Sequence, residues 1–250
     1  MLYDVHAHID LYEDREDVIS YIESKKIYTL AMTNLPGIYE KYQKIYLPFK
    51  HIRFALGFHP ELVLQYCSQL EYFLKLLPYA KYIGEIGLDF SHTRTSQDKN
   101  VQLKIFNEII KYCKSFSDNK ILNIHSRNAA SEVIDIINGY HGKAVLHWFS
   151  GKISDVYNGI NADCFFSVNN QMIDTRRGRE LIEQVPVEKL LIETDAPFSK
   201  MTSSKYCIES INYVYKQLSL IKKTNYDVLQ KQLSENFYSL IDVCNNIHKD

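Results

Sequence analysis

Eight short runs of apolar and β-branched residues recur along the 250-residue chain, and stretches with helical spacing separate them. The runs do not alternate apolar with polar residues, which is typical of strands that are covered on both faces. They are Leu2–Val5, Tyr28–Thr33, Ile52–Leu56, Tyr82–Gly84, Ile121–Ile124, Ala144–Leu146, Cys164–Val168 and Leu190–Thr194. Eight strands that alternate with helices over about 250 residues predict an α/β fold, a TIM (β/α)8 barrel.

A doubly wound open sheet would give the same alternation, but two features disfavour it. No glycine-rich phosphate loop follows the first run, and the unusual polar residues follow many runs instead of meeting at one switch point. No linker, repeat or low-complexity tract interrupts the chain, so residues 1–250 are expected to form a single domain. The last fifty residues predict two helices, at 205–222 and 226–246.

The composition excludes several classes of protein. A net charge of −1 is not that of a strongly basic nucleic-acid coat. The five cysteines are an odd number with no C-x-x-C pair, which argues against a secreted disulfide framework. The N-terminus shows no signal-peptide pattern and the chain no long apolar run. The sequence therefore predicts a cytoplasmic protein without a membrane partner.

Five of the nine histidines follow predicted strands, at the face where barrel active sites lie. They are His6, His8, His59, His125 and His147. The remaining four, His51, His92, His141 and His248, fall in predicted loops or the tail, where solvent exposure is expected. This distribution favours a metal site at the strand ends.

Two carboxylates accompany these histidines. Glu85 lies in GEIGLD, where flanking glycines would let the backbone crowd the barrel mouth, and Asp195 lies in ETDAPF just past the last run. Four histidines and two carboxylates suffice for two divalent ions with Glu85 bridging them. Such a pair suits phosphodiester hydrolysis by metal-activated water, with a carboxylate as the base.

The motifs VHAHID, GFHPE, GEIGLDF, NIHSRNA, LHWFSG and IETDAPF stand in this order and extend over most of the chain. Together they resemble the TatD family of metal-dependent deoxyribonucleases. The resemblance implies a TIM barrel of the metallo-dependent hydrolase type, divalent metal ions, and DNA as the substrate, cleaved from a 3′ end.

The resemblance also implies roles for individual residues. His6 and His8 match ligands of one ion, His125 and His147 match ligands of the second, Glu85 matches the bridge, and Asp195 matches a ligand and the general base. His59 and Asp89 are expected at the mouth beside the substrate, and Arg127 matches a basic position suited to a phosphate oxygen. Mixed histidine and carboxylate sites accept Zn, Mn or Mg, so the metal stays open.

A narrower resemblance joins HIDLYED, LGFHPEL, LHWFSG and ETDAPF to the TatD-type member of the Qat anti-phage defence system. It implies a role in bacterial immunity with sister proteins of that system as partners. One departure concerns the rim. Many TatD-family members carry an Arg-Asn-Glu-Pro-like segment after the final aspartate, and here residues 199–204 read SKMTSS.

Two other functions stay open at this point. An amidohydrolase-type enzyme for small molecules shares the barrel and the H-x-H start, but a lysine on the fourth strand would favour it, and this chain has Glu85. A scaffold subunit of a defence complex with little turnover is the other. The cluster Arg176, Arg177 and Arg179 either guides a nucleic-acid backbone or begins a solvated helix.

Overall fold

The computed structural model describes residues 2–45, 49–91, 93–117 and 119–241, and within these ranges eight parallel strands alternate with helices. The strands are β1 (Leu2–Ala7), β2 (Ile27–Ala31), β3 (Ile52–Phe54), β4 (Tyr82–Gly87), β5 (Ile121–His125), β6 (Lys143–Leu146), β7 (Phe165–Val168) and β8 (Leu190–Ile192). Each of the eight predicted runs overlaps one of them, which confirms the predicted strand number and order.

The strands pair in chain order as a three-stranded sheet, β1 to β3, and a five-stranded sheet, β4 to β8. Isolated bridges join the two sheets at both ends, Leu56 with Ile83 and Ala7 with Ala196. At the second junction the His8 amide donates to the Ala196 carbonyl at 2.7 Å, and the Asp195 amide donates to the His6 carbonyl at 2.9 Å. The eight strands therefore form a ring of the TIM-barrel type with two narrow junctions.

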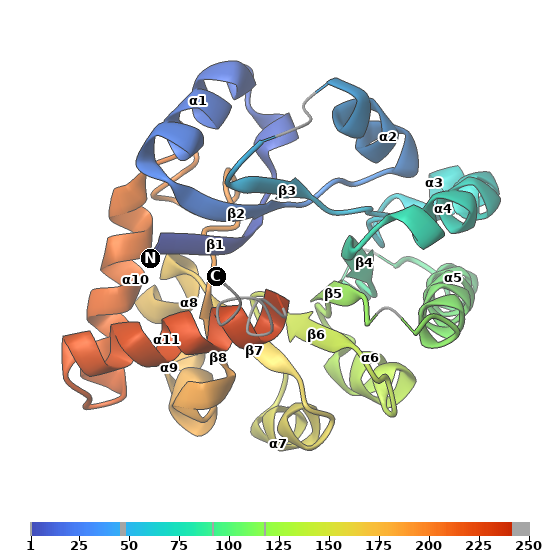
Figure 1. Ribbon diagram of the computed structural model, residues 1–250. Helices are drawn as coiled ribbons and strands as arrows, with labels where there is room; N and C mark the ends of the chain where they lie inside the picture. The colour runs from blue at the N-terminus through green and yellow to red at the C-terminus, as the bar shows by residue number, and fades with distance from the viewer. Residues whose placement is uncertain (1, 46–48, 92, 118, 242–250) are drawn as a thin grey trace.

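Helices lie around the outside of this ring (Figure 1). They are α1 (Arg15–Lys25), α2 (Pro36–Ile45), α3 (Val63–Tyr66), α4 (Leu70–Leu76), α5 (Ser96–Lys114), α6 (Ala130–Ile137), α7 (Ile153–Asn161), α8 (Asn170–Asp174), α9 (Arg176–Gln184), α10 (Ile208–Ile221) and α11 (Tyr226–Ile241). None of these helices of the described chain is both long and apolar enough to cross a membrane.

The two C-terminal helices take their predicted places, except that the predicted end of the second at Asn246 lies outside the described residues. Helix α11 packs against the first strand. The Tyr3 hydroxyl donates to the Leu233 carbonyl at 2.9 Å, and the Tyr3 ring stacks on Phe237 with 4.4 Å between the ring centroids. Helix α11 thereby supports β1, the strand that contains His6 and precedes His8.

Three strands extend further toward their carboxyl ends than predicted, and one of them, β5, continues by one residue through His125. Strand β1 continues through Ala7 and β4 through Gly87, so His6 and Glu85 lie within strands and not after them. In both strands the pairing register shifts at this point, between Asp4 and Ala7 in β1 and between Ile83 and Ile86 in β4. Such irregularities redirect side chains, and they are frequent beside active sites.

The glycines that flank Glu85 stand where the chain is crowded. A Cβ on Gly84 would lie 2.6 Å from the sulfur of Met32. A Cβ on Gly87, where φ is +139°, would lie 2.0 Å from the His125 carbonyl oxygen. The close backbone approach expected of GEIGLD is confirmed, and it brings Glu85 up to the neighbouring strand.

Candidate metal centre and active site

The carboxyl ends of the strands bring all seven predicted metal and catalytic residues into one cluster. His6, Glu85 and His125 lie in β1, β4 and β5. The others follow strands: His8 after β1, His59 after β3, His147 after β6 and Asp195 after β8. Subsets of these residues form three groups in which one ligand atom from each residue lies within 4.8 Å of the others.

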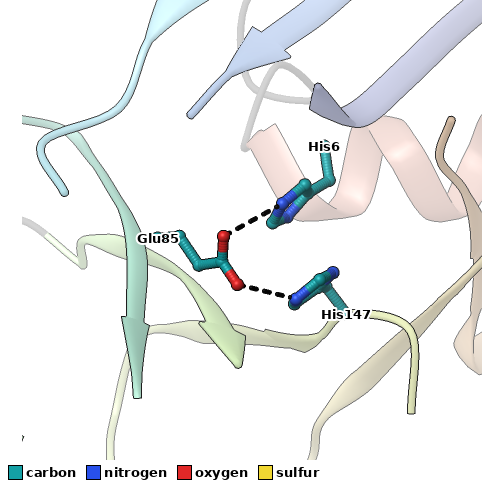
Figure 2. Close-up of side chains that lie close together, drawn as sticks. All are labelled: His6, Glu85 and His147. Carbon is teal, nitrogen blue, oxygen red and sulfur yellow. Dashed lines mark ion pairs between the residues drawn. The ribbon is translucent and has the colours of Figure 1, made fainter. Parts of the chain in front are cut away.

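Glu85 lies at the centre of the cluster (Figure 2). Its Oε2 atom is 3.5 Å from Nε2 of His6 and 3.1 Å from Nε2 of His8. Its Oε1 atom is 2.9 Å from Nε2 of His147 and 2.7 Å from Nδ1 of His125. The two oxygens thus face two different pairs of histidines, as a carboxylate does when it bridges two cations.

Asp195 faces the first of these pairs. Its Oδ1 atom lies 3.5 Å from Nε2 of His6 and 3.7 Å from Nε2 of His8. The Asp195 side chain is buried, and Oδ1 accepts no hydrogen bond from the described residues. A buried carboxylate oxygen without a donor is costly. A divalent cation among these three side chains would remove that cost, so the donor set fits a metal ion.

The charges of the cluster are strongly coupled. Burial would raise the pKa of Glu85, but the neighbouring His59 and His147 hold it well below its ordinary value. Burial would lower the pKa of His147, but Glu85 and Glu193 raise it well above the ordinary value. The pKa values of His6 and His125 are raised as well, because carboxylates lie beside these rings, whereas burial lowers the pKa of His8. In the metal-free protein, the carboxylates thus favour protons on His6, His125 and His147. Divalent cations would replace those protons, as metal binding to histidine does in general.

The side chain of Asn123 orients the ring of His6. Its Nδ2 donates to the carbonyl of Val5 at 2.7 Å, so its Oδ1 must be the atom that lies 2.7 Å from Nδ1 of His6. An amide oxygen accepts only, and the His6 proton therefore sits on Nδ1. The lone pair of the neutral ring is on Nε2, the atom that faces Glu85 and Asp195.

Asp89 has the corresponding relation to His125. Its Oδ2 lies 2.8 Å from Nε2 of His125, and its Oδ1 accepts from the amide of Ser91 at 2.8 Å. Asp89 is fully buried and does not line the cavity described below, so the structure places it behind His125 instead of at the expected position on the mouth. The carboxylate keeps the proton of the neutral ring on Nε2 and leaves Nδ1 to face Glu85.

His59 differs from His6 and His125 in carrying the proton of its neutral ring on the nitrogen that faces the cluster. Its Nδ1 accepts from the amide of Glu61 at 3.2 Å, so the proton of the neutral ring is on Nε2. That Nε2 lies 3.4 Å from Oε1 of Glu85. His59 forms one of the three candidate groups with Glu85 and His125, but in this tautomer its Nε2 is a hydrogen-bond donor toward the cluster.

Two further buried carboxylates support the cluster, and sequence reasoning assigned neither of them. Glu193 accepts hydrogen bonds from the amide of Trp148 at 3.0 Å and from the hydroxyl of Ser167, and its Oε2 is 3.8 Å from Nδ1 of His147. Asp4 accepts from the His6 amide at 3.2 Å and from the Thr194 amide at 2.9 Å, which ties β1 to the segment before Asp195.

A cavity of about 500 Å³ opens onto this cluster. His8, His59, Glu85, His125, His147 and Asp195 line it, together with Glu61, Ser126, Arg127, Trp148, Ser150 and Phe198. Arg127 is exposed and lies at the wall of the cavity, and its contact with a phosphate stays a prediction. The cavity therefore joins the metal ligands to a basic and aromatic rim.

The other histidines lie away from this cavity or outside the described residues. The expectation of a solvated His51 is wrong, because its Nδ1 lies 2.9 Å from Oε2 of Glu23 and its side chain is only 25% exposed. His141 is exposed, as expected. His92 and His248 lie outside the described residues.

Replacement of Asn123 by leucine is expected to weaken metal binding by about 10- to 100-fold, because the His6 ring loses the acceptor that sets its tautomer. Isothermal titration of the metal-free protein with Mn²⁺ or Zn²⁺ would measure the change. Asn107→Leu, an exposed position on α5, is the matched control and should bind like the wild type. Equal affinity in the Asn123 variant would show that this amide does not support a ligand.

Residues 3–242 match the family model described as TatD related DNase. The chain belongs to this family. It is accordingly a metal-dependent hydrolase related to deoxyribonucleases, and the predicted family resemblance is confirmed at that level.

Relatives from bacteria and animals match most of the chain. The uncharacterized metal-dependent hydrolase YabD of Bacillus subtilis is 25% identical, over 94% of this chain and 97% of YabD. The human deoxyribonuclease TATDN3 is 29% identical, over 78% of each chain. The 3′-5′ ssDNA/RNA exonuclease TatD of Escherichia fergusonii is 29% identical, over 74% of each chain.

Solved structures show the same fold. YJJV, a TatD homolog from Escherichia coli K12, superposes with a TM-score of 0.82 at 21% identity, covering 97% of this chain and 98% of YJJV. A TatD family hydrolase from Entamoeba histolytica gives a TM-score of 0.76 at 19% identity, covering 96% of this chain and 97% of the hydrolase. These likenesses support the predicted TIM-barrel metallo-hydrolase fold.

Proposed function

We propose that this protein is a divalent-metal-dependent nuclease that hydrolyses DNA phosphodiester bonds, with Glu85 as the bridge between two ions. His6, His8 and Asp195 would hold one ion, and His125 and His147 the other. The observation that carries the proposal is the division of the Glu85 carboxylate, whose two oxygens face these two pairs of histidines. Two such ions supply an activated water and neutralise the charge on the phosphoryl oxygens.

Side chains that line the cavity would take up the proton of the attacking water and bind the phosphate oxygens. Asp195 is the base that takes the proton of the attacking water, since it is buried at the cavity wall and its Oδ1 accepts no hydrogen bond from the described residues. His59 presents Nε2–H and Arg127 a guanidinium group to the phosphate oxygens. Asp89 positions His125 in this proposal and does not contact the substrate.

We further propose that the substrate is DNA and that cleavage proceeds from its 3′ end. The human relative is named a deoxyribonuclease, which supports DNA as the substrate, and the relative from E. fergusonii is named a 3′-5′ ssDNA/RNA exonuclease, which supports removal of nucleotides from a 3′ end. The test is incubation of the purified protein with 3′- and 5′-labelled single-stranded DNA and Mg²⁺, Mn²⁺ or Zn²⁺. We expect stepwise shortening from the 3′ end that stops in EDTA; cleavage that persists in EDTA would exclude the metal mechanism.

Replacement of His59 by alanine is expected to lower kcat by about 10²-fold while the metal content stays at the wild-type value, since one donor to the phosphate oxygens is lost. Elemental analysis and the labelled-DNA assay, run on the same preparation, would measure both quantities. A fall in metal content parallel to the fall in activity would make His59 a ligand instead.

The role in anti-phage defence is a further part of the proposal, supported by the resemblance of LHWFSG and ETDAPF to the Qat TatD-type protein. In this role the protein acts in the cytoplasm beside the other Qat proteins. Phage plaque counts on bacteria that express the whole system should rise when Asp195→Asn replaces the wild type. Unchanged plaque counts would separate the nuclease from immunity.

A further inference from the structure

A second cavity, of about 290 Å³, lies beside the first. Trp148 and Ser150 line both cavities, so a ligand that extends out of the active site meets the second one directly. Its other lining residues include Met172, Arg177 and Lys200, which come from α8, α9 and the segment after Asp195. The wall thus combines an aromatic ring, an apolar side chain and two cationic side chains.

Trp148 is held in place by the groups that support the metal cluster. It follows His147 directly, its backbone has φ of +37°, and its amide donates to Oε1 of Glu193 at 3.0 Å. A positive φ is uncommon for a bulky residue and persists only where the surroundings impose it. The backbone of Trp148 is therefore fixed at the wall that the two cavities share.

The two cations are placed differently from the neighbouring arginines. Arg177 donates through Nη2 to the Gly151 carbonyl at 3.0 Å, which directs its guanidinium group toward the loop that follows Trp148, and its Nη1 lies 3.6 Å from Oε2 of Glu180. Arg176 is 92% exposed, pairs with Glu180 on its own helix and does not line the cavity. Lys200 is exposed and comes from SKMTSS, the segment that departs from the family pattern. Arg177 and Lys200 are cationic, and no acidic residue is among the described residues that line this cavity.

We propose that the second cavity binds one nucleotide of the DNA strand next to the cleaved phosphodiester, with its base against Trp148 and its phosphate at Arg177 and Lys200. The proposal rests on the proposed nuclease function and deepens it. A base reaches an aromatic ring in this way when it is unpaired, so the cavity favours a single strand over a duplex. Backbone contact by two cations adds affinity without sequence preference.

Because the chain has one tryptophan, its fluorescence reports on this contact directly. Titration of the wild type in EDTA with a single-stranded thymidine decamer should quench Trp148 emission, and a decamer of abasic residues should bind with little quenching. Arg177→Ala and Lys200→Ala should each reduce the slope of log K against log salt concentration by about 0.7, the value for one phosphate contact on single-stranded DNA. Binding seen by anisotropy of a labelled decamer without any change in Trp148 emission would overturn the proposal.

Comparison of kcat/KM for a long and a short substrate distinguishes an effect on nucleotide binding in the second cavity from an effect on the cleavage step. Trp148→Ala should lower kcat/KM for the decamer by about 5- to 150-fold, and Trp148→Phe should restore much of it. Arg177→Ala and Lys200→Ala should lower kcat/KM for the decamer about tenfold and leave that for bis(4-nitrophenyl) phosphate unchanged. Arg176→Ala, the matched control on α9, should resemble the wild type on both substrates.

If the Arg177, Lys200 and Arg176 variants all cleave the decamer with the same kcat/KM, the proposed nucleotide site in the second cavity is wrong. The proposed nuclease function would be unaffected by that result. If the wild type cleaves neither substrate, the proposed nuclease function itself is wrong. The fluorescence titration would still decide whether the cavity holds a base.

Discussion

Asp195→Asn is expected to lower kcat on single-stranded DNA by about 10²- to 10⁴-fold at saturating metal, the range for removal of a positioned general base. The amide keeps the shape of the side chain and can still present one oxygen to a cation, but it cannot take a proton from water. Burial raises the pKa of Asp195 above its ordinary value in the metal-free protein, which means that the ionised carboxylate is less favourable there than in water. Single-turnover kinetics on end-labelled DNA would measure the change.

The control for this substitution is Asp135→Asn, which makes the same change at an exposed position on α6. It should cleave like the wild type. Metal titration of each variant shows whether the loss reflects chemistry or weaker binding. Wild-type turnover in Asp195→Asn at saturating metal would assign the base to another group.

Glu85→Ala is expected to reduce the bound metal from two ions per chain to one or none and to lower kcat/KM by more than about 10³-fold. Both effects have the same origin, because the variant removes the only side chain of the cluster whose two oxygens face both pairs of histidines among the described residues. Elemental analysis after removal of unbound metal would give the stoichiometry, and the labelled-DNA assay the activity.

Glu61→Ala removes a carboxylate that lines the same cavity without belonging to the three ligand groups. It should retain the wild-type metal content. Circular dichroism would verify that the Glu85 variant is folded, since that substitution removes the buried anion that faces five histidines. Two ions per folded chain in Glu85→Ala would mean that this residue is not the bridge.

Hydrophobic runs predicted the strands because each run is largely buried on both faces, and every run overlaps a strand. The ends of β1 and β4 were not predictable in the same way. His6 and Glu85 are polar and come at the ends of their predicted runs, where residue type does not tell the last residue of a strand from the first residue of a loop. Here a shift in strand pairing and a close backbone approach keep both residues within the sheet, with their side chains turned toward the centre of the cluster.

The supporting residues left a signal in the sequence. Side chains two positions apart in a strand share a face. Asp4 precedes His6, Asn123 precedes His125 and Glu193 precedes Asp195, each by two residues. A polar residue two positions before a candidate ligand, inside a buried run, is therefore a candidate for a group that supports the ligands of the cluster, although the ligand that it contacts can come from another strand, as His6 does for Asn123. Val145 before His147 shows that the rule is not general.

The rim followed no such rule. Arg176 and Arg177 are adjacent in the sequence, yet the turn of α9 directs one toward solvent and the other toward a cavity. Asp89 is two residues from the end of β4, but its contact with His125 places it behind the ligands. Such distinctions depend on where loops settle on the barrel, which the spacing of residues does not encode.

Anomalous X-ray diffraction from crystals grown with Mn²⁺ or Zn²⁺ would test the central claim most directly, because it locates each ion. We predict two peaks on opposite sides of the Glu85 carboxylate. One should lie among His6, His8 and Asp195, and the other beside His125 and His147. A single peak that Glu85 does not share, or no peak within this cluster at saturating metal, would contradict the two-ion account.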